Sequence, residues 1–195
     1  MPTDLLPLMT YCFVMSSTPG PNNVMLAASG ANFGYRRALP QIMGTNSGVA
    51  LQTFLTCLGL GTLFVAFPVL HQVLRMAGAL YLAWLAWQLS RAPVAEARSG
   101  KPMSFAQAAL FQAINPKSWV KAITLATVFM PADMSTPVGA LLVAVVGLVI
   151  GFPSASMWAL FGALIRRWLT DPFKRRLFNL SMGAALVLLA VSFLV

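Results

Sequence analysis

Charged residues are scarce in this chain of 195 residues, at 9% of the composition, and only 4 residues are acidic. A soluble domain carries about 25% charged residues, because it needs them to cover its surface. With 58% apolar residues, this chain instead has apolar runs of roughly 20 residues, which is long enough to cross a bilayer. The sequence therefore predicts an all-α polytopic membrane protein, since helices satisfy their own backbone hydrogen bonds in lipid.

Cysteine and histidine are also rare, with 2 cysteines and 1 histidine. Cys12 and Cys57 each lie inside an apolar run, where a cysteine usually behaves as a small buried residue. A membrane thiol–disulfide oxidoreductase would need paired cysteines in equivalent places of two halves, and metal export would need clustered ligands. We therefore expect no metal site and no cofactor, and we do not expect an enzyme.

Six apolar runs are expected to form transmembrane helices, at about 5–29, 39–66, 69–90, 105–130, 138–165 and 175–195. The loops after the first, third and fifth runs hold ten basic residues: Arg36, Arg37, Arg91, Arg98, Lys101, Arg166, Arg167, Lys174, Arg175 and Arg176. The opposite side has only Arg75. Because basic loops stay in the cytoplasm, the prediction leaves both termini outside. A re-entrant first segment would instead place the N-terminus in the cytoplasm.

The two halves of the chain share short motifs in the same order, which predicts an internal duplication. The pairs are Thr18-Pro19 with Asn115-Pro116, Gly44-x-x-x-Gly48 with Gly147-x-x-x-Gly151, and Met76-Ala77-Gly78-Ala79 with Ser181-Met182-Gly183-Ala184. Three spans per copy is an odd number, so the two three-helix repeats are predicted to be inverted, as in many transporters. We predict one transporter domain over 1–195: repeat one at about 1–91, a cytoplasmic linker at about 92–104 and repeat two at about 105–195. The alternative is that Gly and Pro are merely frequent in membrane helices.

Prolines inside the first and fourth runs predict broken helices. Thr18-Pro19-Gly20-Pro21 interrupts the first run and Asn115-Pro116 interrupts the fourth, because proline lacks the backbone donor and clashes with the preceding turn. Thr18 is expected to cap a new half-helix with Pro19 at its first position, and Asn115 and Pro116 are expected to do the same. Both breaks should lie about 15 Å from the cytoplasmic end of their spans.

Two half-helix N-termini that face each other would hold an anion such as a carboxylate. Lys117 and Lys121 share one helix face, and intramembrane lysines are functional candidates unless they snorkel to the interface. Lys117 is the stronger candidate, and the role of Lys121 is open. The four acids lie in loops or near termini, so a bound ammonium must be met by asparagine oxygens and freed carbonyls. The predicted substrate-binding residues are Thr18, Pro19, Gly20, Pro21, Asn22, Asn23, Asn46, Asn115, Pro116 and Lys117.

Thr18-Pro19-Gly20-Pro21-Asn22-Asn23, followed by Gly34-Tyr35-Arg36-Arg37-Ala38, resembles the opening signature of the LysE/RhtB amino-acid exporter family. Gly44-x-x-x-Gly48, Ala83-Trp84-Leu85-Ala86-Trp87 and Asn115-Pro116-Lys117 follow in the family's order, so the likeness covers essentially the whole chain. The resemblance implies a secondary exporter of amino acids in the bacterial plasma (inner) membrane, with protons as a candidate coupling ion. Some relatives that export basic amino acids are thought to use a membrane aspartate. This chain has none, which argues against basic substrates and against carboxylate-based proton coupling.

We therefore predict export of small neutral amino acids or derivatives, with cysteine, O-acetylserine, threonine and homoserine as candidates. An exporter of basic amino acids and a passive channel or scramblase of the same fold are the alternatives. The expected partners are the amino-acid substrate and the lipid bilayer, with protons and a second copy of the chain in a homodimer left open. No nucleic-acid partner is expected, because the basic residues lie in small clusters between apolar runs rather than on one face.

Overall fold

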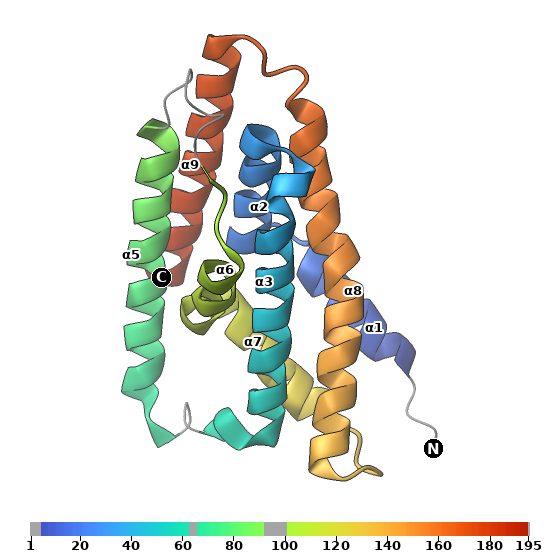
Figure 1. Ribbon diagram of the computed structural model, residues 1–195. Coiled ribbons are helices and arrows are strands. Elements are labelled where there is room, and N and C mark those ends of the chain that lie inside the picture. The colour runs from blue at the N-terminus through green and yellow to red at the C-terminus, as the bar shows by residue number, and fades with distance from the viewer. Residues whose placement is uncertain (1–4, 63–65, 92–100, 195) are drawn as a thin grey trace.

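The computed structural model describes residues 5–62, 66–91 and 101–194, and every regular element within these residues is helical. The long helices stand side by side in one bundle, and shorter helices cross it obliquely (Figure 1). In chain order the elements are α1 (Leu5–Ser17), α2 (Pro21–Phe33), α3 (Tyr35–Leu55), the π-helical turn η1 (Thr56–Leu60), α5 (Pro68–Arg91), α6 (Phe105–Phe111), the 3-10 turn η2 (Gln112–Ile114), α7 (Pro116–Val128), α8 (Thr136–Ile165) and α9 (Pro172–Leu194).

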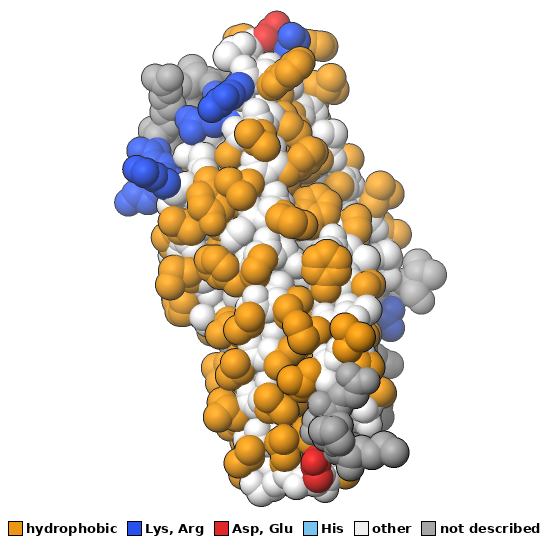
Figure 2. All heavy atoms as spheres, turned by 90° about the vertical axis from the view of Figure 1, so that its right-hand side faces the viewer, with side chains coloured by type: hydrophobic (Ala, Val, Ile, Leu, Met, Phe, Trp, Pro, Cys, Tyr) orange, Lys and Arg blue, Asp and Glu red, His pale blue; other side chains and the backbone are white. Residues whose placement is uncertain are grey.

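The helices of this bundle present an apolar surface. Figure 2 shows hydrophobic side chains spread along the whole visible face, while most of the visible Lys and Arg side chains gather toward the upper end. By length and composition alone, α8 and α9 are apolar enough to cross a membrane, and α1 and the α6–η2 segment are shorter apolar helices. The all-helical class is thus confirmed, whereas the topology of six spans in two inverted repeats stays a prediction.

The basic residues of the described loops lie at one end of the bundle. The α2–α3 junction, the end of α5 and the α8–α9 junction all lie at the top of Figure 1, and these are the places of Arg36, Arg91 and Arg166. Arg75 lies toward the opposite end of α5, where its Nε donates to the Phe193 carbonyl at 2.6 Å. Arg98 and most of the predicted linker lie outside the described residues. Which side of the membrane the basic end faces stays a prediction.

The first helix break lies two residues later than predicted. The Thr18 N–H still donates to the Val14 carbonyl at 3.0 Å, so Thr18 completes the last turn of α1 and cannot cap α2. The cap of α2 is Gly20, in extended conformation with φ −177° and ψ 176°, and Pro21 takes the first helical position. Thr18 and Pro19 were therefore assigned wrongly as cap and first residue, because either proline suits the first turn of a helix.

The loop predicted between the first two spans is a single residue, Gly34. α2 continues to Phe33 and α3 already begins at Tyr35. Gly34 has φ 85°, a backbone conformation that glycine adopts without a steric penalty. The helices therefore extend beyond the spans predicted at 5–29 and 39–66, and the polar Arg36 and Arg37 form the first turn of α3 rather than a loop; the span boundaries in the membrane stay a prediction.

α6 begins inside the bundle and not at its end. Ser104 caps it reciprocally: Ser104 Oγ accepts from the Gln107 N–H at 3.3 Å, and Gln107 Oε1 accepts from the Ser104 N–H at 3.0 Å. The Phe105 carbonyl directly abuts Gly44, which lies midway along α3. The helix of the run predicted at 105–130 thus begins within the bundle rather than at its end, because the segment before it already packs beside Met25.

Three apolar clusters hold the helices together. One joins α2, α5, α6 and α9: Val24, Met25, Ala79, Leu82, Ala86, Phe111, Leu186 and Ala190. The basic-end cluster joins α2, α3 and α8: Leu26, Ala38, Ile42, Ala155 and Ala159. The far-end cluster joins α1, η1, α7 and α8: Leu8, Cys12, Cys57, Leu125, Ala140 and Val143. Along the chain, the first helix break lies between Cys12 of the far-end cluster and Leu26 of the basic-end cluster.

Candidate functional site

Lys117 connects the two helix breaks. Its ammonium donates to the Thr18 carbonyl at 2.8 Å, to Thr18 Oγ1 at 2.8 Å and to the Pro19 carbonyl at 3.1 Å. The carbonyls at the end of a helix lack intrahelical partners, so Lys117 satisfies acceptors that the first break leaves free. A Cβ on Gly20 would lie 2.7 Å from Lys117 Cδ, so glycine leaves room for this side chain. The two breaks are therefore in direct contact, whereas their distance from the cytoplasmic end of their spans stays a prediction.

The second break has the predicted cap. Asn115 is extended, with φ −89° and ψ 105°, and Pro116 follows as the first residue of α7. Asn115 Oδ1 accepts from the Lys117 N–H at 3.2 Å, which satisfies a donor that the helix itself leaves free. The assignment of Asn115 and Pro116 is therefore confirmed.

A reciprocal pair of side-chain amides joins α2 to η2. Asn22 Nδ2 donates to Gln112 Oε1 at 3.0 Å, and Gln112 Nε2 donates to Asn22 Oδ1 at 3.1 Å. Gln112 also donates to the Ala108 carbonyl at 2.8 Å and accepts from Asn115 Nδ2 at 3.2 Å. Gln112 is only 1% exposed, so this buried amide holds the start of α2 against the second break.

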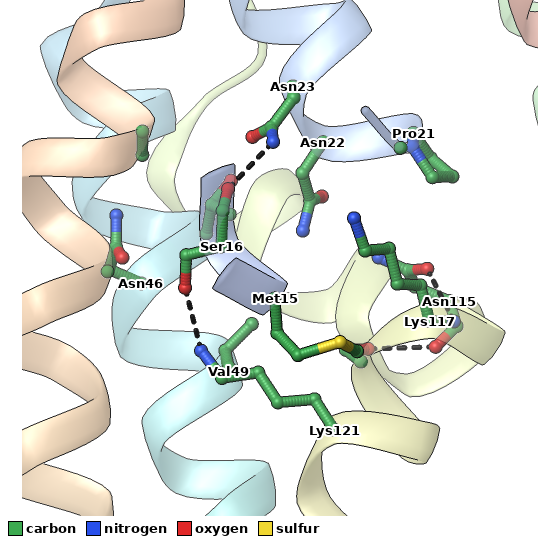
Figure 3. A pocket seen from close by; sticks show the side chains of 15 residues that line it. Met15, Ser16, Pro21, Asn22, Asn23, Asn46, Val49, Asn115, Lys117 and Lys121 are labelled. Carbon is green, nitrogen blue, oxygen red and sulfur yellow. Dashed lines mark hydrogen bonds between the residues drawn. The ribbon is translucent and has the colours of Figure 1, made fainter. Parts of the chain in front are cut away.

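A small cavity with many polar lining residues lies between the breaks, α3 and α8 (Figure 3). Its volume is about 60 Å³. Since one water needs about 10–15 Å³ on this measure, the cavity has room for roughly four to six waters, which is close to the size of a small amino acid. The lining residues are Met15, Ser16, Gly20, Pro21, Asn22, Asn23, Thr45, Asn46, Val49, Asn115, Lys117, Ser118, Lys121, Gly151 and Ala155.

Most of the predicted site residues line this cavity: Gly20, Pro21, Asn22, Asn23, Asn46, Asn115 and Lys117. Thr18 and Pro19 are exposed beside it and hold the Lys117 ammonium. Pro116 begins α7 and does not line the cavity. The structure thus brings all ten residues into one region, and their part in substrate binding is a proposal.

Asparagine side chains hold the cavity wall in place. Asn23 Nδ2 donates to the Ser16 carbonyl at 2.7 Å and to the Thr18 carbonyl at 2.8 Å, which fixes the end of α1 against the start of α2. Asn46 Nδ2 donates to the Ile42 carbonyl at 2.8 Å. This bond turns Asn46 Oδ1 the other way, toward Gly151, where an added Cβ would lie 2.6 Å from it. Asn46 Oδ1 is therefore an acceptor on the cavity wall.

Sequence reasoning left the role of Lys121 open and missed other lining residues. Lys121 is 6% exposed, and its ammonium donates to Ser16 Oγ at 2.9 Å; Figure 3 shows the two side chains pointing toward each other from α7 and α1. The spacing of Lys121 from Lys117 had already made it a candidate. Thr45 and Gly151 lie within the paired glycine motifs, which sequence reasoning used only as evidence of duplication.

The cavity is cationic. Lys117 and Lys121 line it one helical turn apart, and no carboxylate is among the lining residues that the structure describes. The two described acids, Asp133 and Asp171, lie in the segments that precede α8 and α9, away from the cavity. Buried positive charge without a carboxylate partner favours an anionic ligand group. The site can therefore receive a carboxylate, and its described lining residues include no acidic group that could pair with a cationic side chain of a substrate.

The family model of LysE type translocators matches residues 13–195. This chain belongs to that family. Cysteine/O-acetylserine efflux proteins of Escherichia coli (strain K12), Escherichia coli O9:H4 (strain HS) and Shigella sonnei (strain Ss046) are each 33% identical to it over 195 aligned positions, which cover 97% of this chain and 97% of theirs. No solved structure gives a significant match.

Membership of the LysE family makes the protein an amino-acid efflux transporter and not an enzyme. It is a multi-pass protein of the inner membrane, in agreement with its apolar helices. The resemblance noted in its opening motif is confirmed.

Proposed function

We propose that this transporter exports small neutral amino acids from the cytoplasm, with the cavity between the helix breaks as its substrate site. The observation that carries the proposal is the pairing of two lysines with no carboxylate in a cavity of about 60 Å³. A zwitterion brings one carboxylate to this positive charge, whereas a cationic side chain would add a further positive charge. The names of the relatives, cysteine and O-acetylserine efflux proteins, agree with this substrate class.

The same cavity offers acceptors for the substrate's ammonium. Asn46 Oδ1 faces Gly151 on the wall formed by α3 and α8, and Thr45 adds a hydroxyl oxygen to the lining. Neutral oxygens can accept from an ammonium at close range without carrying a charge of their own. A substrate that lies across the cavity would thus have its two charged ends in different surroundings.

The packing along the bundle supports a carrier over a passive channel of the same fold. On α3, Ile42 of the basic-end cluster precedes the cavity residues, and Cys57 of the far-end cluster follows them on η1. On α7, Leu125 closes the far side in the same way. Apolar side chains packed on both sides along these helices disfavour a continuous aqueous path along the bundle, which supports passage of the substrate by movement of the helices.

A competition assay in proteoliposomes tests the substrate class. Lysine and arginine should inhibit the flux of a radiolabelled neutral amino acid at least tenfold less effectively than cysteine, serine or threonine, a difference of about 1.4 kcal/mol in binding. The reason is repulsion between the added cation and the two cavity lysines. Equal inhibition by the basic and neutral amino acids would refute the electrostatic argument, and saturation of the flux separates a carrier from a channel.

Thiol labelling tests the proposed orientation. In a background with Cys12→Ala and Cys57→Ala, we expect Lys174→Cys, at the basic end, to react with a membrane-impermeant maleimide only after the cells are opened. Ala132→Cys, in the exposed segment before α8, is the matched control and should react in intact cells. The reverse pattern would place the basic end outside.

A further inference from the structure

The two cavity lysines differ in how their ammonium groups are used. A lysine ammonium has three N–H donors and no acceptor. Lys117 has three acceptors within hydrogen-bond distance, the Thr18 carbonyl, Thr18 Oγ1 and the Pro19 carbonyl, at 2.8, 2.8 and 3.1 Å. Its donors are therefore fully engaged by the first helix break.

Lys121 is more buried and less engaged. Its side chain is 6% exposed and lines the cavity, and Ser16 Oγ, at 2.9 Å, is the acceptor that the described part of the chain provides. Two of its three N–H donors thus have no acceptor among the described residues. A buried ammonium with one neutral partner is poorly stabilised, so this group can receive an anion that the described cavity wall does not contain.

The first turn of α2 adds to the same site. Gly20, the cap of α2, has no side chain to accept from the free N–H groups of that turn, and Gly20, Asn22 and Asn23 line the cavity with Lys121. Asn23 Nδ2, on α2, also donates to the Ser16 carbonyl. Ser16, whose hydroxyl accepts from Lys121, is therefore hydrogen-bonded to the first turn of α2. A helix N-terminus without a side-chain cap attracts a carboxylate.

From these contacts we propose that Lys121 is the residue that binds the substrate's carboxylate, and that Lys117 is a positioning residue that holds the first break in place. This assignment rests on the proposed function, since it presumes an amino-acid substrate in this cavity. It also divides two lysines of one helix face into two roles. Charge and spacing alone cannot make that division, because it comes from the number of acceptors around each ammonium.

Binding of an amino acid and of its carboxamide to the purified full-length protein tests the assignment. The carboxamide lacks the negative charge but keeps the shape, and ligand-induced thermal stabilisation reports binding without turnover. We expect the wild-type protein to bind serine at least tenfold more tightly than serinamide. Lys121→Met should reduce this ratio to within about threefold of unity, whereas Lys117→Met and Lys174→Met, an exposed surface control, should keep it.

Lys121→Gln guards against a folding defect, because glutamine can still donate to Ser16 while it lacks the charge. It should lose the preference for serine as Lys121→Met does, and Lys121→Arg should retain it. A preserved ratio in the Met and Gln variants, or loss of the ratio in Lys117→Met alone, would overturn the assignment. The proposed function is tested separately by the flux assay: it would be refuted if the wild-type protein in proteoliposomes transported no neutral amino acid.

Discussion

Lys117→Met is expected to lower the initial rate of amino-acid flux in proteoliposomes about a hundredfold. The substitution removes three hydrogen bonds from a charged donor, and each such bond contributes on the order of 1.5–3 kcal/mol. Asn23 Nδ2 would still donate to the Thr18 carbonyl, but the exposed Pro19 carbonyl would lose the ammonium in surroundings where lipid offers no donor. If the conformation in which the two breaks are in contact loses about 3 kcal/mol of stabilisation, its population falls roughly a hundredfold.

Lys174→Met is the matched control, because it removes an exposed lysine at the start of α9. It should transport at close to the wild-type rate. Lys117→Arg should be intermediate, since a guanidinium keeps the charge but not the compact shape that fits beside Gly20. Wild-type flux in Lys117→Met would show that the contact between the breaks is dispensable.

Gly30→Val is expected to prevent correct folding. A Cβ on Gly30 would meet the Ala159 carbonyl of α8, and a Cβ on Gly162 would meet the Ala27 carbonyl of α2. Each glycine thus faces the backbone of the other helix, the close approach that small residues permit in membrane bundles. Overpacking usually costs 1–3 kcal/mol. Here no rotamer change can move a Cβ, so a loss of at least about 3 kcal/mol in unfolding free energy is expected.

Thermal unfolding and size-exclusion profiles in detergent measure this effect. Gly162→Val should behave like Gly30→Val. Gly147→Ala, on the same helix, is the control, because its Cβ would meet only Cys12 Sγ at 4.0 Å. That variant should unfold at or slightly above the wild-type temperature, since alanine favours a helix over glycine. A stable, monodisperse Gly30→Val protein would contradict the backbone contact.

Local chemistry in the sequence was enough to place the second break but not the first. Asn115 followed by Pro116 has one reading as a cap and first helical residue, and the structure has that arrangement. The first break contains two prolines, and either could begin a helix. The choice of Pro21 follows from the Thr18 N–H, which completes α1, and from Lys117, which is 98 residues away from the Pro19 carbonyl it binds. Contacts between distant segments leave no local pattern.

The cavity residues could be predicted only in part, because some have a local sequence pattern and others do not. Asparagines and a lysine beside prolines in an apolar run are conspicuous, and Asn22, Asn46 and Lys117 were found in this way. Ser16 and Thr45 are small polar residues of a kind that membrane helices often contain, so only their position in the folded bundle distinguishes them. The depth of α6 was also hidden, because an apolar run indicates burial or a span without indicating where the helix begins.

The amide pair between Asn22 and Gln112 has a consequence for the response to membrane voltage. Any movement that separates α2 from η2 breaks these two hydrogen bonds, each with a net contribution of about 1 kcal/mol. Both side chains are neutral and can pair equally well with water. Moving one elementary charge through the membrane field involves about 2.3 kcal/mol per 100 mV, but parting this pair displaces no net charge. The hydrogen bonds of this pair should therefore add no dependence on membrane voltage or on salt to the rate of that movement, so any such dependence would come from the charged Lys117 contact beside it.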